Sequence, residues 1–332
     1  MNFIYEVFIW LFIIFLIVIV ITWIIFTHLR SFALFQATHD EKWYPEQEKC
    51  KEDDPPDCRE YSDKFTDGYL IIGDKNHKCF TKQEIINISN SRTWNLGDLH
   101  FINIWKFENF ADKPVVLYYH GNNDNISYRK YVIDICYSLQ LNLVLVDYRG
   151  YGDSGNYPDS KFLLKDAQTA FLHVATEYHH SRIIIWGESL GGIAAIWTAH
   201  KYKCAYLVLL STFADLKTVI NKMEAPKALK NALKNLVQTK LMNNGKWIKN
   251  VDSPTVIMHS PDDDILPYIN AEMLFESVGT NHKKLINIAG PHSHPYLTKE
   301  NLRDLLEFIN IDSYIRNDDK KLDELLDIIN NI

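Results

Sequence analysis

Gly187-Glu188-Ser189-Leu190-Gly191 is the stretch that decides the fold of this chain. An apolar run at 183–186 precedes it, and a helix-compatible run at 192–197 follows it. A serine on a sharp turn between a strand and a helix needs small residues two positions to either side, because larger side chains would collide with the neighbouring elements. The pattern therefore predicts a nucleophile at Ser189. The alternative is an ordinary strand–loop–helix turn.

A catalytic serine needs a base that takes its proton and an acid that orients the base, expected here in the order serine, acid, histidine. The acid is expected in the turn after a late strand, and the strand predicted at 255–259 is followed by an acidic turn at 260–267. We take Asp263 as the candidate acid and Asp262 as the alternative, while Asp215 is less favoured. A solvated loop or helix cap is the other interpretation of this turn.

The base is expected just beyond the last strand, where the chain contains Gly290-Pro291-His292-Ser293-His294. We take His292 as the base, while His294 is the alternative and could instead belong to a substrate loop or a helix start. A pair of histidines two residues apart also suggests zinc. No third ligand with suitable spacing accompanies them, so the sequence predicts no metal site.

An oxyanion hole needs two backbone N–H groups, one from the residue after the nucleophile and one from a loop after an early strand. Leu190 supplies the first. For the second, the strand at 115–119 leads into His120-Gly121-Asn122-Asn123, where the glycine allows a tight backbone path. Either Asn122 or Asn123 is expected to present its amide, and His120 is expected to order the loop.

From residue 114 onward, short apolar runs alternate with helical stretches, which predicts an α/β fold with a mostly parallel sheet and helices on both faces. Strands are expected at 68–72, 100–105, 115–119, 143–147, 182–186, 206–210, 255–259 and 284–288, with a loop joining the first two. Helices are expected at 128–139, 163–178, 192–202, 268–278 and 299–309. The connection at 213–251 is too long for an ordinary link and predicts a short helical cap over the site.

Residues 7–27 contain no charge and match the hydrocarbon thickness of a bilayer, so they predict a transmembrane anchor. A cleaved signal peptide would need a cationic start and a small-residue cleavage site, which this segment lacks. Arg30 after the span favours a cytosolic catalytic domain. Cys50 and Cys58 flank a turn that could close a disulfide loop on the lumenal side, or they are free thiols. The side of the membrane therefore stays open.

The composition limits the partners of this chain of 332 residues, which is long enough for one large domain. Its net charge of −7 argues against a nucleic-acid-binding protein. The chain contains neither a glycine-rich phosphate loop nor a dinucleotide fingerprint, so no cofactor is expected.

Several motifs together resemble the α/β-hydrolase superfamily. They are HGNNDNISYR at 120–129, DYRGYGDSG at 147–155, GESLGG at 187–192, the aspartate four residues before Pro267, and the Gly-x-His at 290–292. The resemblance covers residues 68–309 and points to the single-pass, membrane-anchored serine hydrolases, a branch that contains lysophospholipases, monoacylglycerol lipases and protein depalmitoylases. This chain departs from the family in carrying Asp124 where glycine is usual, and residues 39–67 have no counterpart.

The sequence patterns and the resemblance together predict an anchor at 7–27, a linker or adaptor segment at 28–67, an α/β-hydrolase domain at 68–312 and a C-terminal helix or tail at 313–332. With the anchor, the resemblance implies a membrane-anchored serine hydrolase that cleaves an acyl ester or thioester of a lipid-like substrate. A serine peptidase with the same three residues and a catalytically silent interaction module are the alternatives.

Overall fold

The computed structural model describes residues 17–18, 35–38, 69–74, 79–87, 101–236 and 242–330. Most of the predicted anchor at 7–27 and of the linker at 28–67, including Cys50 and Cys58, lies outside these residues. Among the described residues, no helix has both the length and the apolar character that crossing a bilayer requires.

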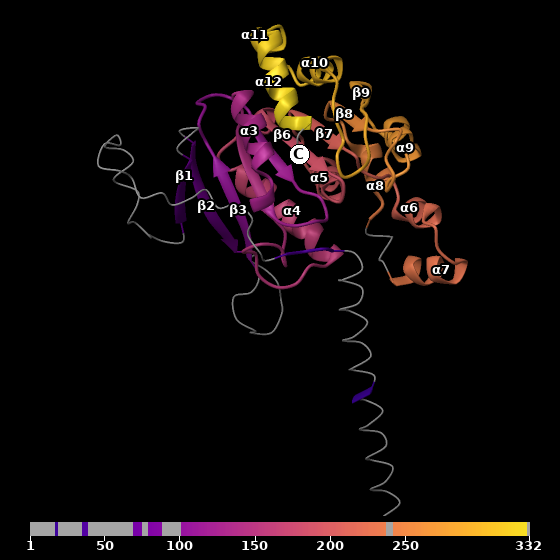
Figure 1. The fold of residues 1–332 in the computed structure, drawn as a ribbon. Helices are drawn as coiled ribbons and strands as arrows, with labels where there is room; N and C mark the ends of the chain where they lie inside the picture. Colours follow the sequence, from indigo (N-terminus) through magenta and orange to yellow (C-terminus); the bar gives the residue numbers. More distant parts are fainter. Residues whose placement is uncertain are drawn as a thin grey trace, which may run out of the picture.

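A nine-stranded sheet forms the centre of the described part (Figure 1). Its order is β1-β2-β3-β5-β4-β6-β7-β8-β9. The strands are β1 (Tyr69–Asp74), β2 (Cys79–Asn87), β3 (Phe101–Phe107), β4 (Val115–Tyr119), β5 (Asn142–Asp147), β6 (Ile183–Glu188), β7 (Tyr206–Leu210), β8 (Thr255–His259) and β9 (Lys283–Asn287). The first three strands are antiparallel, and every pair from β5 to β9 is parallel. The predicted mostly parallel sheet is confirmed.

Strand β2 corrects the sequence prediction, which placed a loop between the first two strands. Residues Cys79–Asn87 instead form a strand that pairs with both β1 and β3. Its sequence CFTKQEIIN mixes charged and apolar residues. A strand near an antiparallel edge is held by its backbone ladder and can face water on one side, so it lacks the apolar run that marks a buried parallel strand.

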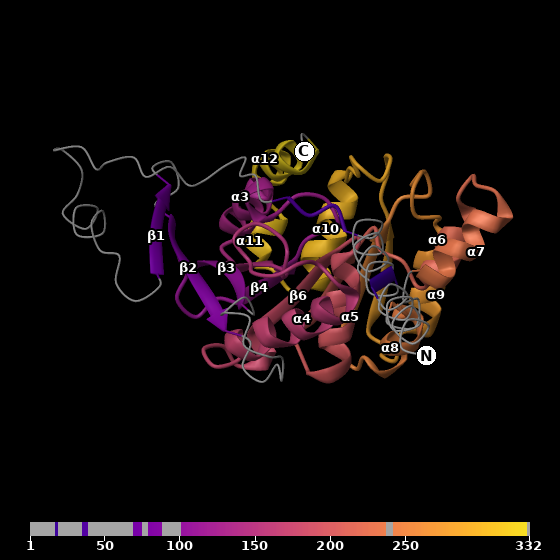
Figure 2. The same cartoon turned by 90° about the horizontal axis from the view of Figure 1, so that it is seen from below.

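Helices cover both faces of the sheet (Figure 2). One layer contains α3 (Lys130–Ser138), α10 (Lys299–Phe308), α11 (Ser313–Arg316) and α12 (Asp319–Asn330), and the other contains α4 (Ser160–Val174), α5 (Gly191–Lys201), α8 (Asn244–Trp247) and α9 (Ile269–Ser277). Single 3-10 turns occur at Ile126–Tyr128, His180–Arg182 and Ile248–Asn250.

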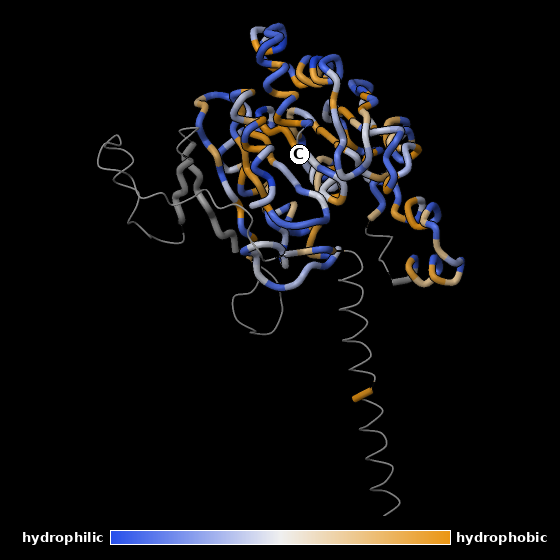
Figure 3. The backbone as a smooth tube through the Cα atoms, viewed as in Figure 1, coloured by the Kyte–Doolittle hydropathy of each residue, from blue (hydrophilic) through white to orange (hydrophobic). Residues whose placement is uncertain are grey.

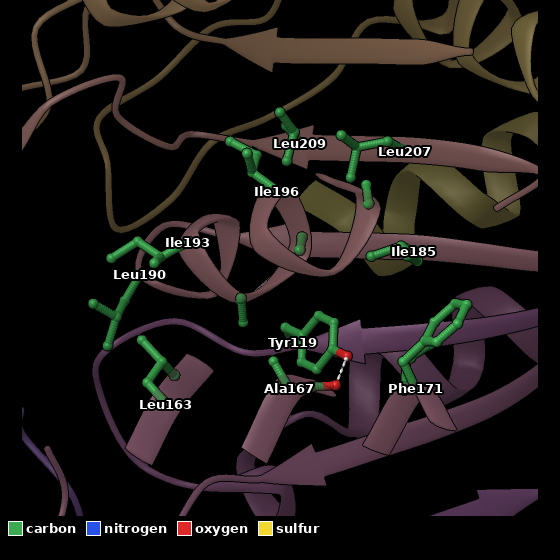
Figure 4. Packing of buried hydrophobic residues seen from close by; sticks show 14 of the residues in the cluster. Tyr119, Leu163, Ala167, Phe171, Ile185, Leu190, Ile193, Ile196, Leu207 and Leu209 are labelled. Atoms are coloured by element: carbon green, nitrogen blue, oxygen red, sulfur yellow. Dashed lines mark hydrogen bonds between the residues drawn. The ribbon is translucent and has the colours of Figure 1, made fainter. Parts of the chain in front are cut away.

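Each face of the sheet has its own apolar core. Hydrophobic and hydrophilic stretches alternate along the chain that supplies these cores (Figure 3). In the core beside α5, Ile196 lies next to the strand residue Leu209, and Ile193 belongs to the same apolar cluster (Figure 4). Within this core, the hydroxyl of Tyr119 donates to the carbonyl oxygen of Ala167 at 2.7 Å, the dashed line in Figure 4. Burial of this apolar area, worth roughly 25 cal/mol per Å², fixes α5 and the turn that precedes it.

The long connection at 213–251 carries α6 (Leu216–Lys222), α7 (Lys227–Leu236) and α8. Helix α8 packs against α5 and α9, whereas α7 stands away from the body of the protein (Figure 1). The expectation that this segment forms a cap over the candidate site stays a prediction.

Gly191→Ala tests how closely the chain is packed after Ser189. A Cβ at Gly191 would lie 2.0 Å from the carbonyl oxygen of Tyr119, so we expect a loss of about 2–3 kcal/mol of stability. That corresponds to a melting temperature lower by roughly 5–10 °C, measured by tryptophan fluorescence. Gly245→Ala is the control, because its Cβ would meet nothing nearer than 3.6 Å. Equal melting temperatures for the two variants would contradict the close approach.

Candidate active site

Ser189 lies on the turn between β6 and α5, with a backbone φ of 50°. This left-handed conformation costs a residue with a side chain about 1–2 kcal/mol. Two hydrogen bonds hold it: the Ser189 N–H donates to the carbonyl of Leu210 at 2.9 Å, and the Thr212 hydroxyl donates to the carbonyl of Ser189 at 2.7 Å. The turn places the serine at the carboxyl edge of the parallel strands.

The structure brings together the three residues predicted to perform acyl transfer. Ser189 Oγ lies 3.0 Å from His292 Nε2, and His292 Nδ1 lies 2.7 Å from Asp263 Oδ2. The three side chains come from separate turns, after β6, β8 and β9. A serine, a base and an acid in a continuous hydrogen-bonded chain have the geometry required to activate the serine.

The carboxylate of Asp263 is held rigidly. Its Oδ1 accepts the N–H groups of Ile265 at 3.0 Å and Leu266 at 2.6 Å, which leaves Oδ2 for the histidine. Burial acts to raise the pKa of Asp263, but the hydrogen bond and charge of His292 and the Leu266 N–H hold that pKa below its usual value. Asp263 is therefore ionised near neutral pH and fixes the histidine with Nδ1–H toward it.

The alternative acids and base lie elsewhere. Asp262 is exposed, and Asp215 caps α6 by accepting the Lys217 N–H at 2.9 Å. His294 is exposed and its Nδ1 contacts the Ser293 hydroxyl at 2.9 Å. The geometry therefore favours Asp263 and His292 over these residues.

The predicted oxyanion loop approaches the nucleophile closely, since a Cβ on Gly121 would lie 3.5 Å from Ser189 Cβ. The C=O and N–H of one peptide plane point in opposite directions, so a donor on one carbonyl orients the next amide. His120 Nδ1 lies 2.8 Å from the Gly121 carbonyl oxygen and thereby orients the Asn122 N–H. The Tyr151 hydroxyl donates to the Asn122 carbonyl at 3.0 Å and orients the Asn123 N–H.

Leu190, the N-cap residue of α5, directly follows Ser189, as the oxyanion prediction requires. Binding of an oxyanion by the amides of Leu190 and of Asn122 or Asn123 stays a prediction.

Glu188, inside the motif, belongs to a polar cluster that the sequence analysis missed. Its Oε2 accepts the hydroxyls of Tyr131, at 2.7 Å, and of Tyr118. Burial acts to raise the pKa of Glu188, but the positive charge of Arg129 and the two hydroxyls hold that pKa below its usual value. Arg129 also donates to the Asn123 carbonyl at 2.8 Å. One arginine thus acts on both the turn that carries Ser189, which we call the elbow, and the oxyanion loop.

His259, at the end of β8, is a second imidazole beside the candidate acid. It is fully buried, and its Nε2 lies 2.8 Å from the Leu266 carbonyl oxygen and 3.4 Å from Asp263 Oδ2. Burial lowers the pKa of His259, so the ring is neutral and donates from Nε2. The ring therefore braces the turn that presents Asp263.

Residues 35–38, which we call the strap, lie against the oxyanion loop although they are far away in sequence. The Gln36 N–H donates to Asn122 Oδ1 at 3.1 Å, and Gln36 forms an isolated parallel bridge with Asn123. Phe35 is only 4% exposed. The sequence analysis assigned this region to a linker, and no local motif marks its contact with the loop.

Among the described residues, no group of three or more histidine, cysteine, aspartate or glutamate side chains is arranged to hold a metal ion. The prediction that the chemistry needs no cofactor stays a prediction.

The comparisons agree with this architecture. Residues 111–250 match the family model of the serine aminopeptidases, S33. Protein bem46 of Schizosaccharomyces pombe is 27% identical over 197 residues, which are 58% of this chain and 63% of that protein. Alpha/beta hydrolase domain-containing protein 17B of Homo sapiens is 25% identical over 60% of this chain and 67% of that protein. The chain belongs to the α/β-hydrolase superfamily.

An uncharacterized membrane protein of Saccharomyces cerevisiae is 28% identical over 57% of this chain and 68% of its own length. The matches thus span about two thirds of the length of each of these three relatives. Among solved structures, the acetyl xylan esterase of Paenibacillus sp. R4 has a TM-score of 0.57 at 16% identity, covering 73% of this chain and 87% of the esterase. The Pyrococcus furiosus esterase Pf2001 has a TM-score of 0.52 at 15% identity, with 88% and 98% covered. These likenesses show the fold.

Alanine at Ser189 or at His292 tests the hydrogen-bonded chain. Each change is expected to lower ester hydrolysis by about four to six orders of magnitude, because the members of such a unit act together. Asp263→Asn should cost about 10⁴-fold, since it disturbs the histidine tautomer. Steady-state hydrolysis of a short p-nitrophenyl ester is the measurement.

The matched control for this test is His294→Ala, an exposed histidine two residues from His292. Its turnover should stay within threefold of the unmodified chain. An inactive His294→Ala beside an active His292→Ala would overturn the assignment of the base.

Proposed function

We propose that this chain is a membrane-anchored serine hydrolase that cleaves an acyl ester or thioester of a lipid-like substrate. The observation that carries the chemistry is the Ser189–His292–Asp263 hydrogen-bonded chain beside a loop with oriented amides. Membership of the α/β-hydrolase superfamily supports it.

The proposed reaction has two halves. Ser189 Oγ attacks the acyl carbonyl while His292 Nε2 takes its proton, and Asp263 stabilises the imidazolium that forms. The carbonyl oxygen becomes an oxyanion that the amides of the loop and elbow bind. His292 then gives its proton to the leaving alcohol or thiol, which leaves the acyl group on Ser189. Water, deprotonated by His292, releases the acid in the second half and restores the serine.

Placement near a membrane rests on the apolar segment at 7–27 and on the strap. Nine residue steps separate residue 27 from Gln36, the strap residue that contacts the oxyanion loop, and nine steps span at most about 32 Å. An anchor at 7–27 would therefore hold Gln36 within about 32 Å of the bilayer. The description of the Saccharomyces cerevisiae relative as a membrane protein supports the same proposal.

A serine aminopeptidase is the second candidate, because the matching family model carries that description. Peptides and esters are cleaved by the same three residues, so the geometry of the chain from serine to aspartate fits both. A comparison of turnover on esters and on peptide amides is therefore needed to distinguish the two functions.

A fluorophosphonate probe followed by a substrate panel tests the proposal. We expect the probe to label the full chain and to spare Ser189→Ala, because only an activated serine reacts with it. The panel compares lysophospholipids, monoacylglycerols, acyl thioesters and dipeptide amides at equal concentration. Turnover of the lipid-like esters or thioesters at least tenfold above the amides is the expected result.

The opposite preference in the panel would favour the aminopeptidase. Absence of labelling together with absence of turnover would leave an interaction module with the hydrolase fold.

Helix α7 provides a test of the membrane-facing part of the proposal. Lys227, Lys230 and Lys234 accompany Leu229, which is 50% exposed. Lysines close to an anionic bilayer contribute about 1 kcal/mol each. Changing the three lysines to glutamate should lower hydrolysis of a lipid ester in anionic vesicles at least tenfold, with little effect on a soluble ester.

The control variant carries the same charge change elsewhere, with glutamate in place of Lys299 on α10 and of Lys320 and Lys321 on α12. Both helices lie far from α7 (Figure 1). An equal effect of both triple variants, or equal losses on both substrates, would leave α7 as an amphipathic helix with a solvated cationic face.

A further inference from the structure

We propose that the strap, residues 35–38, is a positioning element that holds the oxyanion loop in its working conformation. The inference rests on the proposed function, since it assigns a role in the reaction to a segment outside the hydrolase motifs.

The strap contacts the loop at the two residues expected to present the oxyanion amide. The Gln36 N–H donates to Asn122 Oδ1 at 3.1 Å, and Gln36 is bridged to Asn123. Asn122 is partly exposed and Asn123 is exposed, so burial in the core does not fix them. Hydrogen bonds from neighbouring segments must therefore set their conformation.

A second set of contacts fastens the end of the strap. The carbonyl oxygen of Thr38 accepts the Gly152 N–H at 2.9 Å and Asn125 Nδ2 at 3.2 Å. Asn125 lies three residues beyond Asn122, and Gly152 directly follows Tyr151. The strap thus ties the oxyanion loop to the turn after β5.

Phe35 acts through the tyrosine that orients the loop. Its ring meets Tyr151 edge-on, with 6.4 Å between ring centroids. The hydroxyl of that tyrosine donates to the Asn122 carbonyl at 3.0 Å and also lies 3.3 Å from Asn122 Oδ1. The strap therefore reaches Asn122 by two routes, one from Gln36 and one through Tyr151.

The backbone of the loop explains why outside support is needed. Asp124 has a φ of 63°, a left-handed conformation that aspartate adopts at a cost and that glycine, usual in the family at this position, adopts freely. Displacing a catalytic group by about 1 Å costs on the order of 10²-fold in rate. A loop with a strained residue and little burial of Asn122 and Asn123 thus depends on hydrogen bonds from its neighbours.

Two substitutions of one residue in the full chain test the strap. Gln36→Pro removes the N–H that donates to Asn122, whereas Gln36→Ala keeps it. With a short p-nitrophenyl ester, Gln36→Pro should lower kcat about 10²-fold with KM within threefold, because the loss affects the transition state. Gln36→Ala should lower kcat less than threefold. Equal kcat values for the two variants would overturn the proposal.

A second pair of variants tests whether an effect of Gln36→Pro comes only from general destabilisation of the fold. Phe35→Ala and Phe171→Ala each remove a buried phenylalanine ring from the same apolar core, but only Phe35 touches Tyr151. Assayed at least 20 °C below both melting temperatures, Phe35→Ala should lose at least tenfold in kcat and Phe171→Ala less than threefold. Equal losses in kcat would reduce the strap to a stabilising segment.

Hydrogen exchange separates failure of this inference from failure of the proposed function. Faster exchange at the amides of Asn122 and Asn123 in Gln36→Pro than in Gln36→Ala is expected whether or not an ester is cleaved. Ester hydrolysis that survives Ser189→Ala would refute the proposed function and leave this measurement intact. Unchanged exchange would refute the strap's role on the loop.

Discussion

The candidate active site depends on one close contact between backbones, where the helix after Ser189 begins. Gly191 lies so near the end of β4 that a Cβ there would come within 2.6 Å of the carbonyl oxygens of both Tyr119 and His120. This contact brings the start of the oxyanion loop next to the nucleophile. A side chain at position 191 would push the two segments apart.

Two carboxylates, those of Asp263 and Glu188, belong to the site, and their hydrogen-bond partners give them different roles. Asp263 faces His292 and two backbone N–H groups, so its charge is directed at the histidine. Glu188 faces two tyrosine hydroxyls and the charge of Arg129, which satisfy it away from the serine. An unbalanced negative charge next to the oxyanion loop would oppose the charge that develops there. The arginine removes that conflict and also fastens the Asn123 carbonyl.

The sequence predicted those features that depend on residues close to one another along the chain. The elbow, the parallel strands and the positions of Asp263 and His292 follow from spacing along the chain, and the structure places these groups as expected. Strand β2 was missed because a strand next to an antiparallel edge can face water on one side and needs no apolar run. His259 and Arg129 were missed because their partners become visible only when separate strands meet. The strap was missed for the same reason, since it joins residue 36 to residue 122 without any sequence pattern.

The energetics of the strap suit an element that responds to its surroundings. Ordering four residues costs roughly 1–2 kcal/mol each in backbone entropy. Burial of Phe35 returns about 2–3 kcal/mol, and the hydrogen bonds of Gln36 and Thr38 add about 1 kcal/mol each. The opposing contributions are of similar size, so docking of the strap is close to balance. An anchor that fixed residue 27 in a bilayer would reduce the freedom lost on docking and so favour the docked form. By thermodynamic linkage, docking of the strap and engagement of the membrane would then support each other.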